Sequence, residues 1–153
     1  MSWTTIRVDR LRLIERMRAS FDVVRYKMGA KPDLRALPGQ GFREADCSGF
    51  VRWLIYQASY GKTKMPLGSW HQRRWCERMG FKLTDYAHTA LSDNRLRIGF
   101  TNPKAKRAGH VWLIFNRASI ECSGGRGAGR RAWYTPVLAD RVDFCFVLTE
   151  PIQ

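Results

Sequence analysis

Three residue types that can hydrolyse an amide together are spread along this chain of 153 residues: a cysteine, a histidine and a carboxylate. Cys47 stands in the stretch ADCSGFV, directly ahead of an apolar run. His110 begins the stretch HVWLIF, and Glu121 follows eleven residues later. Nucleophilic cysteine chemistry needs a thiolate, a base that forms it, a group that orients the base, and donors for the oxyanion. The sequence contains one candidate for each role.

Cys47 is expected to open a buried helix over residues 47–60, which Gly61 closes. The unpaired amides and the positive dipole end of such a helix lower a thiol pKa below its usual value of about 8.5. The backbone N–H of Cys47 is also a candidate donor to the oxyanion. Taken alone, a cysteine in an apolar helix is more often a small core residue.

Glu121 is expected to orient His110. The eleven-residue spacing fits two adjacent antiparallel strands joined by a turn near Asn116, which lets the carboxylate face one ring nitrogen and fix the tautomer. A carboxylate inside the apolar stretch SIEC otherwise lacks a reason. A histidine at a strand start is more often a surface residue, but the combination of Cys47, His110 and Glu121 favours catalysis.

The elements that must position these residues follow from hydrophobic periodicity. Apolar residues at steps of three and four predict one long N-terminal helix over about residues 5–28, followed by a loop over 29–45. A capping box at Ser69 and Gln72 predicts a short helix that stops at Gly80. The second half predicts strands at 96–100, 110–115, 118–122 and 142–148. The periodic residues of the first helix are Leu11, Ile14, Met17, Phe21, Val24 and Met28.

This order predicts an α+β fold with N-terminal helices packed on a small antiparallel sheet. We expect one domain over residues 1–153, with a catalytic core over about residues 26–150. The sequence shows neither a secretory signal nor an apolar run of about 18 residues, so we expect a soluble protein made in the cytoplasm.

Composition limits the partners and cofactors. A formal net charge of +14 favours polyanions of any kind, although a solubilising basic surface explains it equally well. The four cysteines form no Cys-x-x-Cys pair, and reduced thiols are expected. A metal site built from Cys47, Cys76, His71 and His110 matches no zinc spacing, so no metal or other cofactor is expected.

The stretch ADCSGFV resembles the Asp-Cys-Ser-Gly-aliphatic-Val signature of the NlpC-type cysteine peptidases, papain-like enzymes that cleave peptidoglycan stem peptides. AGHVWLIFNRASIECSG is similar to that family's histidine motif, and VRYKMG to its tyrosine-glycine segment. The resemblance implies a papain-like fold with Cys47 as nucleophile, His110 as base, Glu121 as the orienting residue and Tyr26 beside the reaction centre.

By the same resemblance, Asp46 and Ser48 line the pocket near the amino end of the substrate. Trp112 departs from the family, in which a small residue is common at that position, and is expected to narrow the groove. Glu121 departs from the family, in which His, Asn or Gln is common at that position. The implied bond joins γ-D-glutamate to the diamino acid of the stem peptide.

The leading interpretation is therefore a monomeric peptidoglycan endopeptidase, either a phage lytic or virion-associated enzyme or a delivered toxin, that acts in the bacterial cell wall or periplasm. Basic patches would contact the wall or another polyanion. One alternative is a non-enzymatic polyanion-binding or phage structural domain on the same fold. No nucleic-acid motif is present, and nucleic acid is not the expected partner. Another alternative is an acyl or amide hydrolase with a substrate outside the wall.

Overall fold

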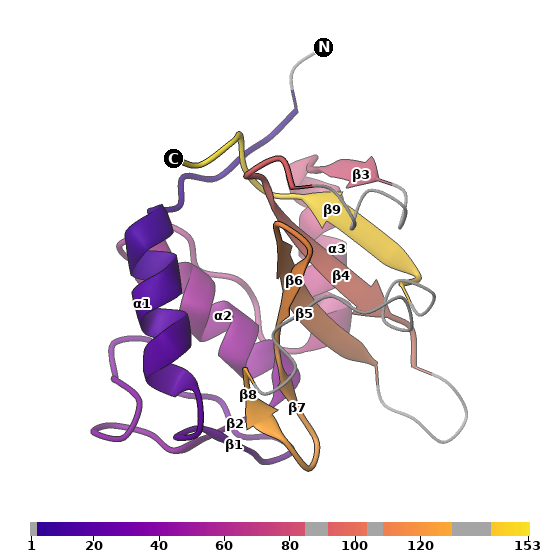
Figure 1. Cartoon of the computed structure of the whole chain (residues 1–153). Helices are drawn as coiled ribbons and strands as arrows, with labels where there is room; N and C mark the ends of the chain where they lie inside the picture. Colours follow the sequence, from indigo (N-terminus) through magenta and orange to yellow (C-terminus); the bar gives the residue numbers. More distant parts are fainter. Residues whose placement is uncertain (1–2, 85–91, 104–108, 130–141) are drawn as a thin grey trace.

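The computed structural model describes residues 3–84, 92–103, 109–129 and 142–153 (Figure 1). In these ranges the helices are α1 (Arg10–Ser20), α2 (Cys47–Ala58) and α3 (Ser69–Met79). The main sheet is antiparallel, in the order β3 (Lys82–Thr84), β9 (Phe144–Val147), β4 (Leu96–Thr101), β5 (His110–Phe115) and β6 (Ala118–Ile120). The fold is α+β, as the sequence predicts.

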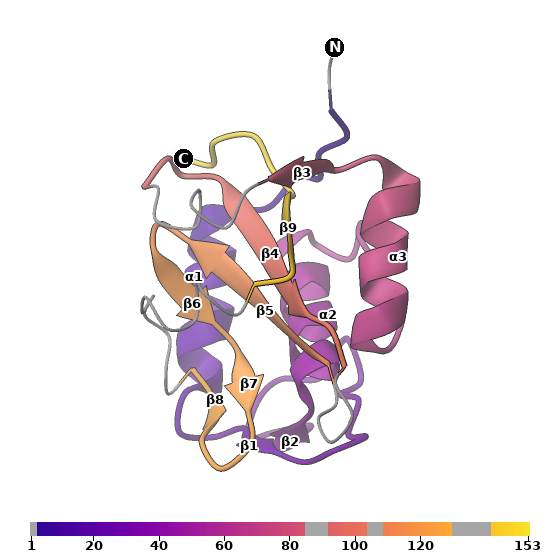
Figure 2. The same cartoon turned by 90° about the vertical axis from the view of Figure 1, so that its right-hand side faces the viewer.

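Two short strand pairs lie beside the main sheet. β1 (Arg25–Tyr26) pairs in parallel with β2 (Glu44–Ala45), and β7 (Cys122–Ser123) pairs antiparallel with β8 (Gly127–Ala128). Both pairs lie together at the lower end of the molecule in Figures 1 and 2. The sequence patterns did not predict β1, β2, β3 or β8, because strands of two or three residues carry too little periodicity.

The core lies between α2 and the sheet. α2 packs between α1 and β5, and Figure 2 shows α1 and α2 behind the sheet with α3 beside its β3 edge. Phe50, Trp53 and Leu54 of α2 are fully buried. They belong to the same core cluster as Ile98 of β4 and Leu113 of β5, which pair with each other across the two strands. No helix among the described residues has the length and hydrophobicity needed to cross a lipid bilayer.

The predicted long helix over residues 5–28 is wrong in extent, because α1 covers only Arg10–Ser20. Asp9 caps it, since its carboxylate accepts the backbone N–H of Arg12 at 2.9 Å. The chain before the cap is held elsewhere: the N–H of Ile6 donates to the Leu148 carbonyl at 2.8 Å. At the other end Asp22 has a φ of 61°, a left-handed conformation that ends the helix.

The predicted apolar face of this helix also needs correction. Leu11 and Met28, both assigned to that face, are 72% and 73% exposed, whereas Leu13 is fully buried. The buried face runs through Leu13 and Ser20 instead, with Met17 packed against the core between them.

The predicted capping box of α3 is wrong as well, although the helix itself and its end at Gly80 are correct. Gly68 is the N-cap residue and provides no side-chain hydrogen bond. Gln72 is fully buried, and its amide donates to the carbonyls of Ser48 and Pro66 at 3.0 Å each. The side chain therefore ties α3 to the first turn of α2 and is not available for capping.

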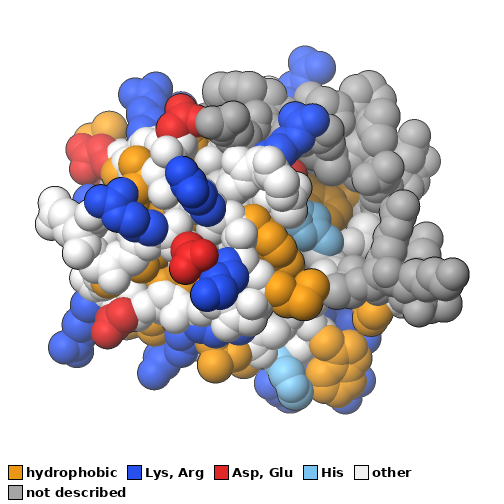
Figure 3. Space-filling view, turned by 90° about the horizontal axis from the view of Figure 1, so that it is seen from below, with side chains coloured by type: hydrophobic (Ala, Val, Ile, Leu, Met, Phe, Trp, Pro, Cys, Tyr) orange, Lys and Arg blue, Asp and Glu red, His pale blue; other side chains and the backbone are white. Residues whose placement is uncertain are grey.

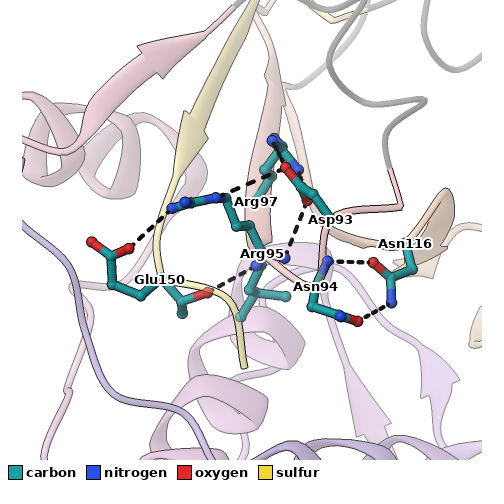
Figure 4. Close-up of polar contacts among 8 residues, drawn as sticks. Asp93, Asn94, Arg95, Arg97, Asn116 and Glu150 are labelled. Carbon is teal, nitrogen blue, oxygen red and sulfur yellow. Dashed lines mark hydrogen bonds and ion pairs between the residues drawn. The ribbon is translucent and has the colours of Figure 1, made fainter. Parts of the chain in front are cut away.

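A polar network fixes the end of the sheet at which β5 turns into β6 (Figure 4). Asn116 and Arg117 form the two-residue turn, with φ values of 47° and 70°, the backbone that a tight hairpin requires. Asn116 exchanges two hydrogen bonds of 2.8 Å with Asn94, one to its backbone N–H and one to its side chain. Nearby, the buried Arg97 forms a two-point ion pair with Asp93, which lowers the pKa of that carboxyl.

We expect replacement of Leu13 by alanine to cost about 3 kcal/mol of unfolding free energy, because it leaves a cavity in the core. Leu11→Ala is the matched control on the same helix, and it should change stability by less than about 0.5 kcal/mol. Chemical denaturation of both variants measures the difference. Equal losses would contradict the orientation of α1.

Candidate active site

Asp46 fixes the start of α2 and with it the position of Cys47. Its carboxylate accepts the backbone N–H of Gly49 at 2.7 Å and the hydroxyl of Ser48 at 3.1 Å. Cys47 is thus the first helical residue, with 8% of its surface exposed. In the described part of the chain, the N–H groups of Cys47 and Ser48 have no acceptor, which leaves both free to donate to a bound group.

Gly49 lets a loop approach this helix end. A Cβ atom at this position would lie 2.8 Å from the carbonyl oxygen of Ala30, too close for any other residue without movement. The same carbonyl accepts the N–H of Asp46 at 2.9 Å. The glycine in the stretch DCSG is therefore required by the packing of residue 30 against the start of α2.

His110 and Glu121 lie side by side across the sheet. Nε2 of His110 is 3.2 Å from Oε2 of Glu121, whose residue is only 3% exposed. The thiol of Cys47 also interacts with the imidazole, and this interaction raises the pKa of His110. Because Nε2 faces the carboxylate, Nδ1 is the ring nitrogen available to the thiol. The structure thus brings together the three residues that the sequence singled out, although their catalytic roles stay predictions.

The surroundings of His110 favour its charged form. Burial of the ring lowers the pKa of His110, but interactions with Cys47 and Glu121, including the hydrogen bond to Glu121, outweigh burial and raise it from 6.5 to about 9. A ring with this pKa is an imidazolium at neutral pH. It can then donate one N–H to Glu121 and carry a proton toward a leaving group.

The hairpin turn determines this pairing. Phe115 pairs with Ala118 and Leu113 with Ile120, so Glu121 lies one position beyond the last paired residue of β6. His110 is the first residue of β5, where the side chain is 28% exposed at the rim of the sheet. Figure 3 views the end of the molecule at which α2 begins, and shows histidine and hydrophobic side chains together with Lys and Arg spread around them.

Tyr26 lies next to Cys47, the predicted nucleophile. It pairs with Ala45, two residues before Cys47. Burial and the charges of Cys47 and Asp46 raise the pKa of its hydroxyl, which therefore stays protonated and can donate a hydrogen bond. This position agrees with the one that the sequence resemblance implies, and a role in catalysis remains to be tested.

The other cysteines are buried, neutral thiols. All four cysteines are free, and burial raises the pKa of Cys122 and of Cys145 to about 12 and raises that of Cys76 as well. Cys122 donates to the carbonyl of Ala45 at 3.4 Å. Within the described ranges, no three His, Cys, Asp or Glu side chains gather so as to hold a metal ion.

Lys31 was not singled out from the sequence, yet it contacts Asp46 and Ser48, the two residues predicted to line the substrate pocket. Its ammonium forms an ion pair with the Asp46 carboxylate and donates to the Ser48 hydroxyl at 2.7 Å. The side chain of Lys31 is 28% exposed and that of Asp46 is 10% exposed. Both predicted pocket residues are therefore engaged by a cation of the chain itself. Nothing in the sequence around Lys31 indicates these contacts.

Trp112 does not line an open groove. The residue is 1% exposed, and its ring stacks on His110 at 5.4 Å between centroids with 23° between the planes. It lies across Gly99 of β4, where a Cβ atom would be 3.0 Å from the indole. Since the buried ring has almost no surface for a substrate, we assign it to the positioning of the imidazole.

Comparison with known proteins identifies a solved structure with a similar fold. No protein-family model and no curated protein matches the chain. A crystal structure from Staphylococcus aureus subsp. aureus Mu50, described as similar to a lipoprotein of the NLP/P60 family, matches with a TM-score of 0.56 at 16% sequence identity. The two chains share a fold. The match covers 98% of this chain and 45% of the other, so this chain spans less than half of that protein's length. The α+β arrangement is consistent with the papain-like fold that the sequence predicts.

We expect Glu121→Gln to lower the pKa of His110 from about 9 toward 6.5, because the acceptor loses its charge. Titration of the histidine ring protons by NMR measures this shift. The ring signals of the exposed His71 are the internal control and should be the same in wild type and variant at each pH.

The same substitution tests linkage. Because the folded-state pKa of His110 is raised, the stability that Glu121 provides is fully present below pH 6.5 and is lost as the pH rises through about 9. The gap in unfolding free energy between wild type and Glu121→Gln should therefore close over this range. A gap that widens toward high pH would contradict the assignment.

Proposed function

We propose that the protein is a cysteine peptidase that hydrolyses an amide bond in the stem peptides of bacterial peptidoglycan. The observation that carries this proposal is that His110 interacts with both Cys47 and Glu121, with the Glu121 carboxylate 3.2 Å from Nε2, on a fold shared with an NLP/P60-family protein. The resemblance of ADCSGFV to the cysteine motif of that kind of peptidase supports the same substrate class, and the implied bond is the one between γ-D-glutamate and the diamino acid.

In the proposed reaction, the thiolate of Cys47 attacks the carbonyl carbon of the substrate amide. A C–S bond forms, and the negative charge moves to the carbonyl oxygen, which accepts the free N–H groups at the start of α2. The imidazolium of His110 donates its proton to the amide nitrogen as the C–N bond breaks, which releases the amine and leaves a thioester.

Hydrolysis of the thioester uses the same groups in reverse. The now neutral imidazole removes a proton from water, the resulting hydroxide attacks the thioester carbon, and the C–S bond breaks to give the carboxylic acid and the thiolate. In this reaction Glu121 keeps the ring oriented and stabilises its charged form, and the protonated hydroxyl of Tyr26 is the proposed helper at the reaction centre.

The ion pair of Lys31 narrows the choice of substrate. A peptide with a free amino end would have to displace the ammonium of Lys31 to reach the carboxylate of Asp46. We therefore propose that the enzyme does not require a free amine at this end and accepts stem peptides still joined to other groups.

Cys47→Ala should abolish cleavage, with a loss of about a thousandfold or more, because no other group replaces the nucleophile. The measurement is mass spectrometry of muropeptides from purified peptidoglycan. Cys76→Ala is the matched control, since it removes a buried thiol of α3 without touching the site, and it should retain activity. Cleavage that survives Cys47→Ala would refute the mechanism. Intact muropeptides together with hydrolysis of another acyl compound would move the same chemistry to a different substrate.

Lys31→Met should shift the preference toward peptides with a free amino end, because the carboxylate of Asp46 loses its cation. The wild-type enzyme should cleave free and N-acetylated versions of one stem peptide with kcat/KM values within about threefold of each other, and the variant should favour the free peptide by about tenfold, the effect of roughly one charge-assisted hydrogen bond. An unchanged ratio would show that Asp46 does not face the substrate.

A further inference from the structure

A second polar region lies at the end of α2 opposite to Cys47, where α1 and a loop meet it. They enclose a surface hollow of about 380 Å³. Three arginines from two separate segments line this hollow, together with the last turn of α2. Its polar residues are Arg12, Arg16, Arg35, Tyr56, Gln57 and Tyr60.

Gln57 holds two of these arginines in fixed positions. Its side chain is anchored by a 2.7 Å hydrogen bond from Nε2 to the carbonyl of Leu34, and the residue is 5% exposed. Its Oε1 accepts Nε of Arg16 at 2.9 Å and a terminal nitrogen of Arg12 at 3.4 Å, while its backbone carbonyl accepts Nε of Arg12 at 2.6 Å. Because these guanidinium groups are already ordered, a ligand would lose little entropy in binding them.

This arrangement concentrates positive charge. Arg12 and Arg16 are four residues apart on α1 and share one acceptor oxygen, although like charges at this spacing repel each other. Arg35 adds a third charge from the loop and interacts with Tyr56. Among the described residues, no carboxylate forms an ion pair with any of the three.

Of the carboxylates nearest in sequence, Glu15 lies next to Arg16 on α1 but forms no ion pair among the described residues, and the other two accept local hydrogen bonds. Asp9 accepts the N–H of Arg12 and the hydroxyl of Tyr60, and Asp33 accepts the N–H of Arg35 at 2.9 Å. Asp9 and Asp33 attract the charges of Arg12 and Arg35 without forming an ion pair with them, so compensation of the three positive charges by the described residues is partial. An anion in the hollow would relieve the repulsion, and guanidinium groups bind phosphate oxygens particularly well through paired N–H donors.

The aromatic rings at the hollow indicate what kind of anion fits. The guanidinium of Arg12 lies over the ring of Tyr60 at 4.6 Å, and Gly61 lies against the ring of Tyr56, where a Cβ atom would be 3.1 Å from the phenol carbon and oxygen. The ring of Tyr60 therefore already has a guanidinium over one face, and the phenol end of Tyr56 lies close to Gly61. Nucleic-acid sites that bind single strands use open ring faces on which bases stack. The hollow instead offers charge and N–H donors.

We propose that the hollow lined by Arg12, Arg16 and Arg35 binds the phosphate groups of an anionic phosphodiester polymer that carries no nucleobases. The net charge of +14 would attract such a polymer from a distance, and the ordered arginines would bind it. This site lies apart from the Cys47 region and does not depend on the catalytic proposal.

A purely structural role accounts for only part of this arrangement. Arg12 satisfies the carbonyl of Gln57 in the last turn of α2, as basic residues often do at a helix end. This role uses one nitrogen of Arg12. It does not explain why Arg16 shares the same glutamine or why Arg35 joins them from another segment.

Arg16→Gln tests the proposal, with Arg18→Gln as the matched control on the same helix. Arg18 is exposed, lies on another side of α1 and does not line the hollow, and both changes remove one charge. The probe is a fluorescent glycerol phosphate oligomer, and its Kd is measured over a range of salt concentrations. Arg16→Gln should weaken binding by about tenfold and reduce the salt dependence by about one phosphate contact. Arg18→Gln should change Kd by less than about threefold.

Arg35→Gln provides a second test, because Arg35 is exposed and its loss should leave the fold intact even if Arg16→Gln unfolds. It should also weaken binding more than the control does. Equal effects of all three substitutions would overturn the proposal in favour of diffuse charge. Tighter, arginine-dependent binding of single-stranded DNA of equal charge would overturn it in favour of nucleic acid. The oligomer contains no amide, so either result is independent of peptidase activity.

Discussion

The carboxylate of Asp46 is the interaction on which the candidate site depends. One oxygen accepts the N–H of Gly49 and the hydroxyl of Ser48, and the other oxygen pairs with the ammonium of Lys31. The first contact decides where α2 begins, and the third holds the preceding loop against the helix. A thiol placed one residue later in the chain must then lie in the first turn, near backbone N–H groups that have no intrahelical acceptor.

Residues at the ends of neighbouring strands supply the other half of the candidate site. His110 stands at the rim of β5, Glu121 comes from the neighbouring chain segment, and the ring of Trp112 supports the imidazole from the same strand. The charged groups are thus held by packed elements, which reduces the reorganisation that a reaction would require. Gln72 extends this support from α3, because it reaches the carbonyl of Ser48 from a fully buried position.

Long and strongly apolar elements could be predicted from the sequence. The helix that starts at Cys47 and the strands around His110 and Phe146 have enough buried residues to give a clear pattern. α1 was overestimated because the apolar residues on either side of it continue the helical spacing, while the chain there forms backbone bonds with other segments, as Ile6 does with Leu148. Leu11 and Leu13 are chemically alike, and only tertiary packing decides which one is buried.

The candidate site was predictable to a similar degree. The contact between His110 and Glu121 follows from strand spacing, because a hairpin has a fixed geometry. Lys31 and Gln72 could not be found in this way, since each reaches the start of α2 from a distant segment and nothing in its local sequence indicates the contact. The extent of the domain over residues 1–153 stays a prediction.

The two-residue turn at Asn116 and Arg117 has a consequence for how a protein of this architecture can vary in length. Side chains alternate between the two faces of a strand, so one inserted or deleted residue between His110 and Glu121 would turn the carboxylate away from the ring and leave it buried without a partner. The connection between β7 and β8, with Gly125 and Arg126 exposed, carries no such constraint. Insertions and deletions in related chains should therefore be found in the β7–β8 connection and be rare in the β5–β6 hairpin.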